Sequence, residues 1–204
     1  MESKTIYVLR HGQTDLNLKG MVQGRGVNSS LNDTGRQQAL LTFQYFKDQV
    51  FDIIYTSSLK RTHETVSHFN QEKIELEGLD EISWGNQEGV VPTNESKTLY
   101  AETVKEWQNG NLDANLGGGE SPRQVMERQK KAMEVVLSNG DKNILICMHG
   151  RAMRILLSWF TDTPMSKMDD FEHANCCYYK LEWTPFRVDI LERNMTKHLE
   201  VASS

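Results

Sequence analysis

The chain has 204 residues, of which 38% are hydrophobic and 25% are charged, and its net charge at pH 7 is −5. This length and composition are typical of one globular domain with a sizeable core. This negative net charge argues against a protein that binds nucleic acid through a broad positively charged surface, although a few local arginines can still bind a small anion. The three cysteines form no Cys-x-x-Cys spacing, so we expect reduced thiols in a reducing compartment.

The sequence shows no apolar leader segment and no apolar run long enough to span a bilayer. We therefore expect a cytoplasmic protein whose partners include neither a membrane nor a nucleic acid. We also expect a single domain over residues 1–204, with a small cap-like insert at about residues 90–118. The oligomeric state is not encoded in any pattern of this sequence.

Strand-like and helix-like patterns alternate along the chain, beginning with an apolar run that precedes a glycine-containing loop. Asn32 is a candidate N-cap, and Ser121 followed by proline and a glutamine at the third helical position is a strong helix start. We expect strands at residues 6–9, 51–55, 74–79, 143–148, 175–183 and 187–193, and helices at about 33–50, 59–69, 96–107, 121–138 and 150–160. This alternation predicts an α/β fold, with a mainly parallel sheet and helices on both faces.

Two of the apolar runs each end in a His-Gly pair. Residues 6–9 lead into Arg10 and His11, and residues 143–148 lead into His149. In open α/β sheets, ligands bind beyond the carboxyl ends of the strands. The repeated pattern therefore predicts a site in which two imidazoles lie side by side.

Further polar residues follow at the same edge of the predicted sheet. Arg61 lies in the first turn of the helix after the second strand, and Asn17 lies shortly after the first His-Gly pair. Because a buried unpaired arginine is costly, Arg10 and Arg61 together imply an anion between them. A neutral histidine is a good nucleophile, and fixed donors suit the oxygens of a transferring phosphoryl group. These residues therefore point to phosphoryl chemistry.

The motif L-R-H-G-Q-T at residues 9–14 resembles the signature of the histidine phosphatase superfamily, in the branch similar to cofactor-dependent phosphoglycerate mutase. The resemblance implies a phosphoglycerate mutase-like three-layer α/β/α sandwich. Two departures are Ser30, where many members have proline, and residues 27–29, which replace the usual acidic residue. Other matching positions follow in the family's order to about residue 150, with a late one at Asn175: Asn17, Gln23-Gly24, residues 31–39, 57–62, 79–81, Gly85, Glu88-Gly89, 119–121 and His149-Gly150.

The resemblance also implies roles for the residues of the phosphate pocket. His11 is the expected nucleophile, which forms a phosphohistidine. Arg10, Arg61 and His149 are expected to line the phosphate pocket, with Asn17 as a further donor. No metal and no cofactor are expected, because the sequence has no ligand spacing such as His-x-x-His or His-Glu-x-x-His.

For the general acid, the resemblance points to Glu81, which would protonate the leaving oxygen and then activate water. Glu88 is the rival, although its Gln-Glu-Gly setting is more often structural in this family. Gln23 and Gly24 are expected to contact the substrate beyond its phosphate.

Three activities then compete. The first is a metal-independent phosphoric monoester hydrolase acting on a small phosphorylated metabolite; the second is a phosphoglycerate mutase; the third is an inactive binding or regulatory relative. A mutase needs a second anion site in the insert, but residues 82–119 contain two lysines and no arginine, which favours the phosphatase. Trp84, Tyr100 and Trp107 either line the substrate site or anchor the insert in the core.

Overall fold

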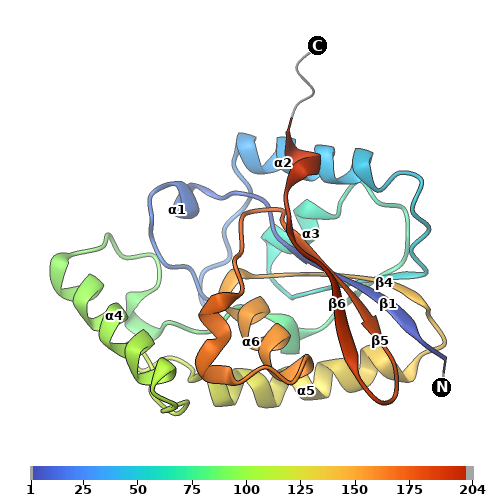
Figure 1. The fold of residues 1–204 in the computed structure, drawn as a ribbon. Coiled ribbons are helices and arrows are strands. Elements are labelled where there is room, and N and C mark those ends of the chain that lie inside the picture. Colours follow the sequence, from blue (N-terminus) through green and yellow to red (C-terminus); the bar gives the residue numbers. More distant parts are fainter. Residues whose placement is uncertain (1, 201–204) are drawn as a thin grey trace.

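A six-stranded sheet lies between two layers of helices in the computed structural model, which describes residues 2–200 (Figure 1). The strand order is β3-β2-β4-β1-β5-β6. The pairs β1–β4, β2–β4 and β2–β3 are parallel, whereas β5 and β6 extend the sheet in antiparallel fashion. The expected three-layer, mainly parallel architecture is therefore confirmed. The strands are β1 (Lys4–Arg10), β2 (Ile53–Thr56), β3 (Lys73–Glu75), β4 (Asn143–Met148), β5 (Tyr178–Trp183) and β6 (Val188–Met195).

The helices divide between the two faces of the sheet. In Figure 1, α2 and α3 lie above the sheet, α5 and α6 lie below it, and α4 projects at the side. Alternate residues of β1 enter different cores: Ile6 packs in the cluster that includes α5 and α6 residues, and Tyr7 packs in the cluster beneath α2 and α3. Burial on both faces explains why β1 is a continuous apolar run. The helices are α1 (Asp15–Leu18), α2 (Asp33–Tyr45), α3 (Lys60–Thr65), α4 (Asn94–Gln108), α5 (Pro122–Ser138) and α6 (Gly150–Phe160).

Helix starts agree with the capping residues in the sequence. The Asn32 side chain accepts the backbone N–H of Gly35 at 2.9 Å, and Ser121 and Gln124 form a reciprocal capping box at the start of α5. Proline follows Ser121 inside the first turn, where its missing N–H costs nothing.

Several boundaries differ from the sequence-based expectation, and the helix expected at residues 59–69 is only Lys60–Thr65. The strand expected at residues 74–79 is only Lys73–Glu75, because β2 ends at Thr56 and leaves no partner strand for the rest. Residues 77–79 form a short 3-10 helix instead. The helix expected to reach residue 50 ends at Tyr45, so Val50 is exposed rather than buried. The strand expected from residue 175 begins at Tyr178, after a turn in which Cys176 has a positive φ of 53°.

Residues 90–118, where the sequence predicts a cap-like insert, contain α4 and the loops around it. Trp107 of α4 is fully buried in a cluster separate from the two main cores, and its ring nitrogen donates to the carbonyl of Ala114 at 2.9 Å. The single-domain assignment stays a prediction, and its residues 1 and 201–204 lie outside the described residues. Between residues 2 and 200, no helix combines the length and apolar character that a membrane span requires.

Candidate active site

His11 and His149 lie side by side where β1 and β4 end. Their ring centroids are 5.1 Å apart, and the backbone N–H of His11 donates to the carbonyl of Met148 at 3.0 Å. This hydrogen bond therefore joins the carboxyl ends of β1 and β4 next to the two histidines. The loop after His11 packs directly against the start of α2, since a Cβ on Gly12 would lie 2.7 Å from the carbonyl oxygen of Gly35.

The hydrogen bonds of the two imidazoles differ. His11 Nδ1 donates to the carbonyl of Gly12 at 2.7 Å, which places the proton on Nδ1 and leaves the Nε2 lone pair free. His149 Nδ1 accepts from Arg61 Nε at 3.1 Å, and its Nε2 donates to Ser57 Oγ at 2.7 Å. His11 therefore has an unprotonated nitrogen available to a ligand, while His149 uses both nitrogens within the protein.

Two guanidinium groups approach this histidine pair without carboxylate partners of their own. Arg61 is fully buried. Besides bonding to His149, it donates to the carbonyls of Val27 at 2.8 Å and Gly24 at 3.3 Å. Arg10 donates to the carbonyl of His173 at 2.8 Å, and its Nε is buried without a partner among the described residues. Burying a guanidinium group that forms no direct ion pair is costly, so the two arginines favour an anion at this site.

The same burial and charges control protonation. Burial first, and then the charges of Arg61 and Arg10, hold the pKa of His11 well below 6.5. Burial and the Arg61 charge likewise depress the pKa of His149. Burial lowers the pKa of Arg61 to about 10, which leaves this guanidinium charged at neutral pH. A neutral imidazole beside charged guanidinium groups is the combination that nucleophilic attack on phosphorus requires.

A cavity of about 150 Å³ opens beside His11. Of the residues expected from the sequence, Arg10, His11, Asn17, Gln23 and Glu81 line it. Arg61, His149 and Gly24 are not among the described residues that line the cavity; they lie behind its wall, joined by the bonds from Arg61. Their assignment as direct phosphate or substrate contacts stays a prediction.

Asn17 and Gln23 differ in what they can offer a ligand. Asn17 Oδ1 accepts from the backbone N–H and hydroxyl of Thr14 and from Asn175 Nδ2, each at 3.2 Å, which leaves its amide nitrogen to donate into the cavity. Both polar atoms of Gln23 are already bonded, to Thr14 Oγ1 at 2.7 Å and to Ser29 Oγ at 2.6 Å. Asn17 is thus the better placed donor.

Glu81 lies at the N-terminus of α6. Its Oε1 accepts the backbone N–H of Ile82 at 2.9 Å and of Ala152 at 2.8 Å, and its Oε2 accepts that of Arg151 at 3.1 Å. The helix dipole favours a carboxylate in this position. These bonds fix the side chain of Glu81 at the cavity wall.

Glu88, the rival acid, points elsewhere. Its Oε1 accepts the backbone N–H of Trp84 at 2.8 Å and the hydroxyl of Ser83 at 3.1 Å. It packs so closely on the Gln23-Gly24 loop that a Cβ on Gly24 would lie 2.3 Å from Oε1. Glu88 is not among the described residues that line the cavity, and its contacts support the loop that binds Arg61.

Arg128 of α5 was not anticipated from the sequence. Its Nη1 donates to the carbonyls of Gly78 and Asp80, both at 2.9 Å, and its Nη2 donates to the carbonyl of Glu81 at 3.0 Å. It also bonds both carboxylate oxygens of Glu120, at 2.9 and 3.0 Å. Arg128 therefore holds the segment that carries Glu81. The sequence offers one sign of its inward position, which is that Arg128 follows the buried Val125 of α5 by three residues.

Arg151 and His173 also line the cavity, and they too were missed. Arg151 donates to Asp169 Oδ1 at 2.6 Å and to the hydroxyl of Tyr100 at 3.0 Å. Burial and the charge of Arg10 lower the pKa of His173 to about 3. Arg151 directly follows the second His-Gly pair, which could have indicated it; His173 lies in a segment without a regular pattern.

Trp84, which precedes the insert, and the insert residues Tyr100 and Trp107 divide between the two expected roles. Trp84 and Tyr100 line the cavity, with ring centroids 5.3 Å apart. Trp107 lies behind them as a core anchor, 6.0 Å from Trp84 between ring centroids.

The cysteines are structural. Cys147, Cys176 and Cys177 are free and buried, and burial raises the pKa of Cys176 to about 12 and that of Cys177 to about 11. Thiols in this state are poor nucleophiles. Among residues 2–200, no cluster of three or more His, Cys, Asp or Glu side chains is arranged to hold a metal ion.

The fold, the paired histidines and the unpaired arginines define a known class of protein. The chain belongs to the histidine phosphatase superfamily (branch 1), whose family model matches residues 6–196. This confirms the family expected from the motif at residues 9–14.

Individual relatives cover nearly the whole chain. Phosphoserine phosphatase 1 of Hydrogenobacter thermophilus is 28% identical over 199 residues, which is 95% of this chain and 93% of the relative. The uncharacterized phosphatase PhoE of Bacillus subtilis is 29% identical over 199 residues, 95% of this chain and 96% of the relative. The solved structure of Bacillus stearothermophilus YhfR shares the fold, with a TM-score of 0.82 at 23% identity over 97% of this chain and 100% of that one. Both relatives are named as phosphatases, in agreement with the predicted enzyme class.

Other relatives are much longer. The chain spans 39% of a probable 2-carboxy-D-arabinitol-1-phosphatase of Arabidopsis thaliana and 36% of a fructose-2,6-bisphosphatase of Saccharomyces cerevisiae. These relatives therefore contain long stretches of chain that this sequence does not match.

Proposed function

We propose that this protein is a phosphoric monoester hydrolase that acts on a small phosphorylated metabolite through a phosphohistidine at His11. One observation carries the proposal: a neutral, buried imidazole stands beside two arginines that pair with no carboxylate among residues 2–200. Arg10, which lines the cavity, offers fixed donors of the kind that the equatorial oxygens of a transferring phosphoryl group need, and Arg61 adds its charge from behind the wall.

The proposed reaction has two steps. His11 Nε2 attacks phosphorus while the bond to the leaving oxygen breaks, and Glu81 gives that oxygen a proton. A water molecule then attacks the phosphohistidine, Glu81 takes the proton from the water, and the N–P bond breaks to release phosphate. The position of Glu81 at the cavity wall supports this assignment over Glu88, which lies outside the wall.

The mutase alternative requires a second site for an anion. Among the described residues, the cavity lining adds one arginine, Arg151, which pairs with Asp169 at 2.6 Å; Asp169 also pairs with Arg154 at 2.7 Å, so it offsets only part of their charge. Hydrolysis is proposed because residues 82–119 contain no arginine for a second anion site, and the assay below distinguishes it from the mutase. Three free buried thiols support a reducing, cytoplasmic location as part of the same proposal.

The test is phosphate release from a panel of phosphomonoesters in the presence of a metal chelator. Wild type should release phosphate and form an acid-labile phosphoprotein, and His11→Ala should do neither. His63→Ala is the matched control, because the His63 side chain is 37% exposed and pairs with Glu75 at 3.1 Å. Equal release by wild type and His11→Ala would overturn the proposal. Conversion of 3-phosphoglycerate into its 2-phospho isomer without phosphate release would favour the mutase.

A further inference from the structure

A second pocket adjoins the catalytic cavity and takes no part in the chemistry proposed above. Its volume is about 390 Å³, against about 150 Å³ for the cavity beside His11. Sites that enclose a small organic molecule usually measure about 300–1,000 Å³. The cavity beside His11 falls below that range, so the organic part of a substrate must extend beyond it.

The two spaces share a wall. Val22 and Tyr100 line both of them. Tyr100 is held in place by its hydroxyl, which accepts from Arg151 Nη2 at 3.0 Å, and by its ring, which packs on Trp84 with centroids 5.3 Å apart. A substrate whose phosphate sits beside His11 can therefore pass its organic group along this fixed ring into the second pocket.

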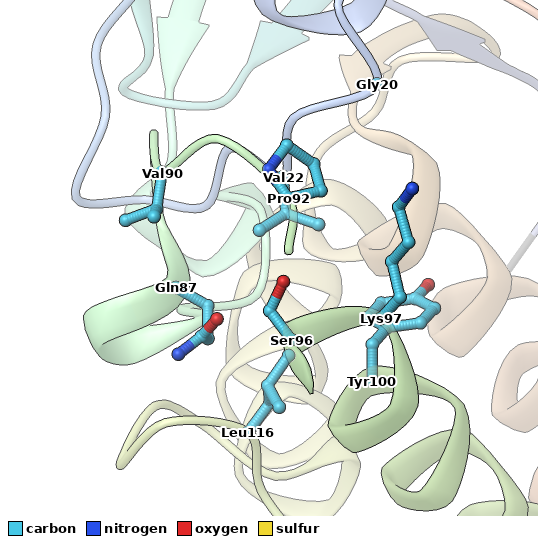
Figure 2. A pocket seen from close by; sticks show the side chains of 9 residues that line it. All are labelled: Gly20, Val22, Gln87, Val90, Pro92, Ser96, Lys97, Tyr100 and Leu116. Atoms are coloured by element: carbon cyan, nitrogen blue, oxygen red, sulfur yellow. The ribbon is translucent and has the colours of Figure 1, made fainter. Parts of the chain in front are cut away.

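The chemistry of the second pocket differs from that of the catalytic cavity. Figure 2 shows its side chains converging from the loop before Gln23, the segment at residues 87–92, the first turns of α4 and Leu116. Most of them are apolar, namely Val22, Val90, Pro92, Leu116 and the ring of Tyr100. Among the described residues of the lining, the polar side chains are Gln87, Ser96 and the exposed Lys97, which is the one charged residue. Because apolar side chains outnumber these three, the lining favours hydrocarbon over a polyhydroxy group, most of whose hydroxyls would have no partner.

We infer that this pocket binds the leaving group of the substrate and selects phosphomonoesters of apolar alcohols over sugar phosphates. The inference rests on the proposed hydrolase function and adds the substrate class. Each methylene buried in the pocket should raise kcat/KM by about fourfold, because its transfer from water contributes about 0.8 kcal/mol.

The experiment compares kcat/KM for ethyl phosphate, butyl phosphate, hexyl phosphate and glucose 6-phosphate. Hexyl phosphate and glucose 6-phosphate have the same number of carbons and differ in polarity. For wild type, we expect kcat/KM to rise from ethyl to hexyl phosphate by up to about 250-fold, the limit for burying all four added methylenes, and hexyl phosphate to exceed glucose 6-phosphate. A flat alkyl series, or a preference for the sugar phosphate, would overturn the inference.

Ser96→Trp tests the location, because Ser96 lies in the pocket wall on α4. The indole should remove the gain for hexyl phosphate and lower kcat/KM for hexyl phosphate far more than for ethyl phosphate. Ser96→Ala is the first control, since it also loses the hydrogen bond from the backbone N–H of Thr93 to Ser96 Oγ at 2.9 Å without filling the pocket. Leu99→Trp is the second, because Leu99 is 42% exposed on the same helix. Equal losses for all esters in Ser96→Trp would contradict the assignment.

The two proposals fail in different ways. If no ester is hydrolysed in a His11-dependent manner, the hydrolase proposal falls and the leaving-group assignment falls with it. If esters are hydrolysed without regard to chain length, only the pocket assignment falls. The wild-type alkyl series decides this even if Ser96→Trp does not fold.

Discussion

Replacing Glu81 by glutamine should damage both stability and catalysis, and the structure separates the two effects. The carboxylate accepts three backbone N–H groups, from Ile82, Arg151 and Ala152. A glutamine amide can accept with one end only, so its NH₂ must face at least one of these donors. An unpaired buried donor costs about 1–3 kcal/mol, and the lost charge at the start of α6 adds up to about 1 kcal/mol. The free energy of unfolding should therefore fall by about 1–4 kcal/mol.

The catalytic loss should depend on the leaving group. For an alkyl phosphate, whose leaving oxygen needs a proton, Glu81→Gln should lower kcat/KM, which reports the transfer to His11, by about 10²–10⁴-fold. For nitrophenyl phosphate, which releases a weakly basic phenolate, the loss in kcat/KM should be less than about tenfold, although kcat falls for both substrates because the water step is shared. Urea titration gives the stability, and steady-state kinetics on the two substrates gives the ratio of losses.

Glu88→Gln is the matched control, because it makes the same chemical change in a carboxylate that lies outside the cavity wall. Its effect on the two substrates should be equal. If Glu81→Gln lowered kcat/KM equally for both substrates, or if the leaving-group dependence appeared in Glu88→Gln instead, the assignment of Glu81 as the acid would be wrong.

Two further predictions concern stability. The pKa values of His11, His149 and His173 are all lowered in the folded protein, to about 3 for His173, so the unfolded chain binds more protons below about pH 6.5. The free energy of unfolding should therefore decrease as the pH falls from 6.5 towards 4, by up to about 1.4 kcal/mol per group and pH unit. Urea titrations at several pH values should show that this free energy depends less steeply on pH in His173→Gln than in wild type. An unchanged pH dependence would contradict this reasoning. Arg128→Met should lower the free energy of unfolding by about 3 kcal/mol, because it leaves Glu120 partly buried without its main partner, and should slow turnover by loosening Glu81. Arg123 lies on the same helix, and its exposed pair with Asp113 is solvated. Arg123→Met should therefore lower the free energy of unfolding by less than about 1 kcal/mol. Equal losses of stability in the two variants would show that Arg128 does not hold the segment that carries Glu81.

Local patterns carried most of what could be predicted. The apolar runs before His11 and His149 specified two buried strands, and their parallel pairing then required the two histidines to meet. The N-caps Asn32 and Ser121 bond to residues within one helical turn, so the local sequence was enough to predict them.

The missed features depend on distant partners. Arg128 reaches carbonyls that lie 47 to 50 residues earlier in the chain, and no pattern near residue 128 identifies them. Likewise, the depth of Arg61 and His149 behind the cavity wall depends on side-chain packing between α3 and β4. β3 is short because its partner strand is short, which a single segment cannot reveal.

The arrangement of the cavity walls has a consequence for how the substrates of this protein could be changed. His11, Arg10 and Arg61 belong to strand ends and a helix start, whereas Trp84 and Tyr100 come from the insert and the loop leading to it. The groups proposed for reactivity and those proposed for selectivity thus lie in separate stretches of chain, one embedded in the sheet and one attached at its side (Figure 1). Under these proposals, randomising the lining residues between 84 and 118 should change the substrates that are accepted and leave the groups proposed for phosphoryl transfer intact.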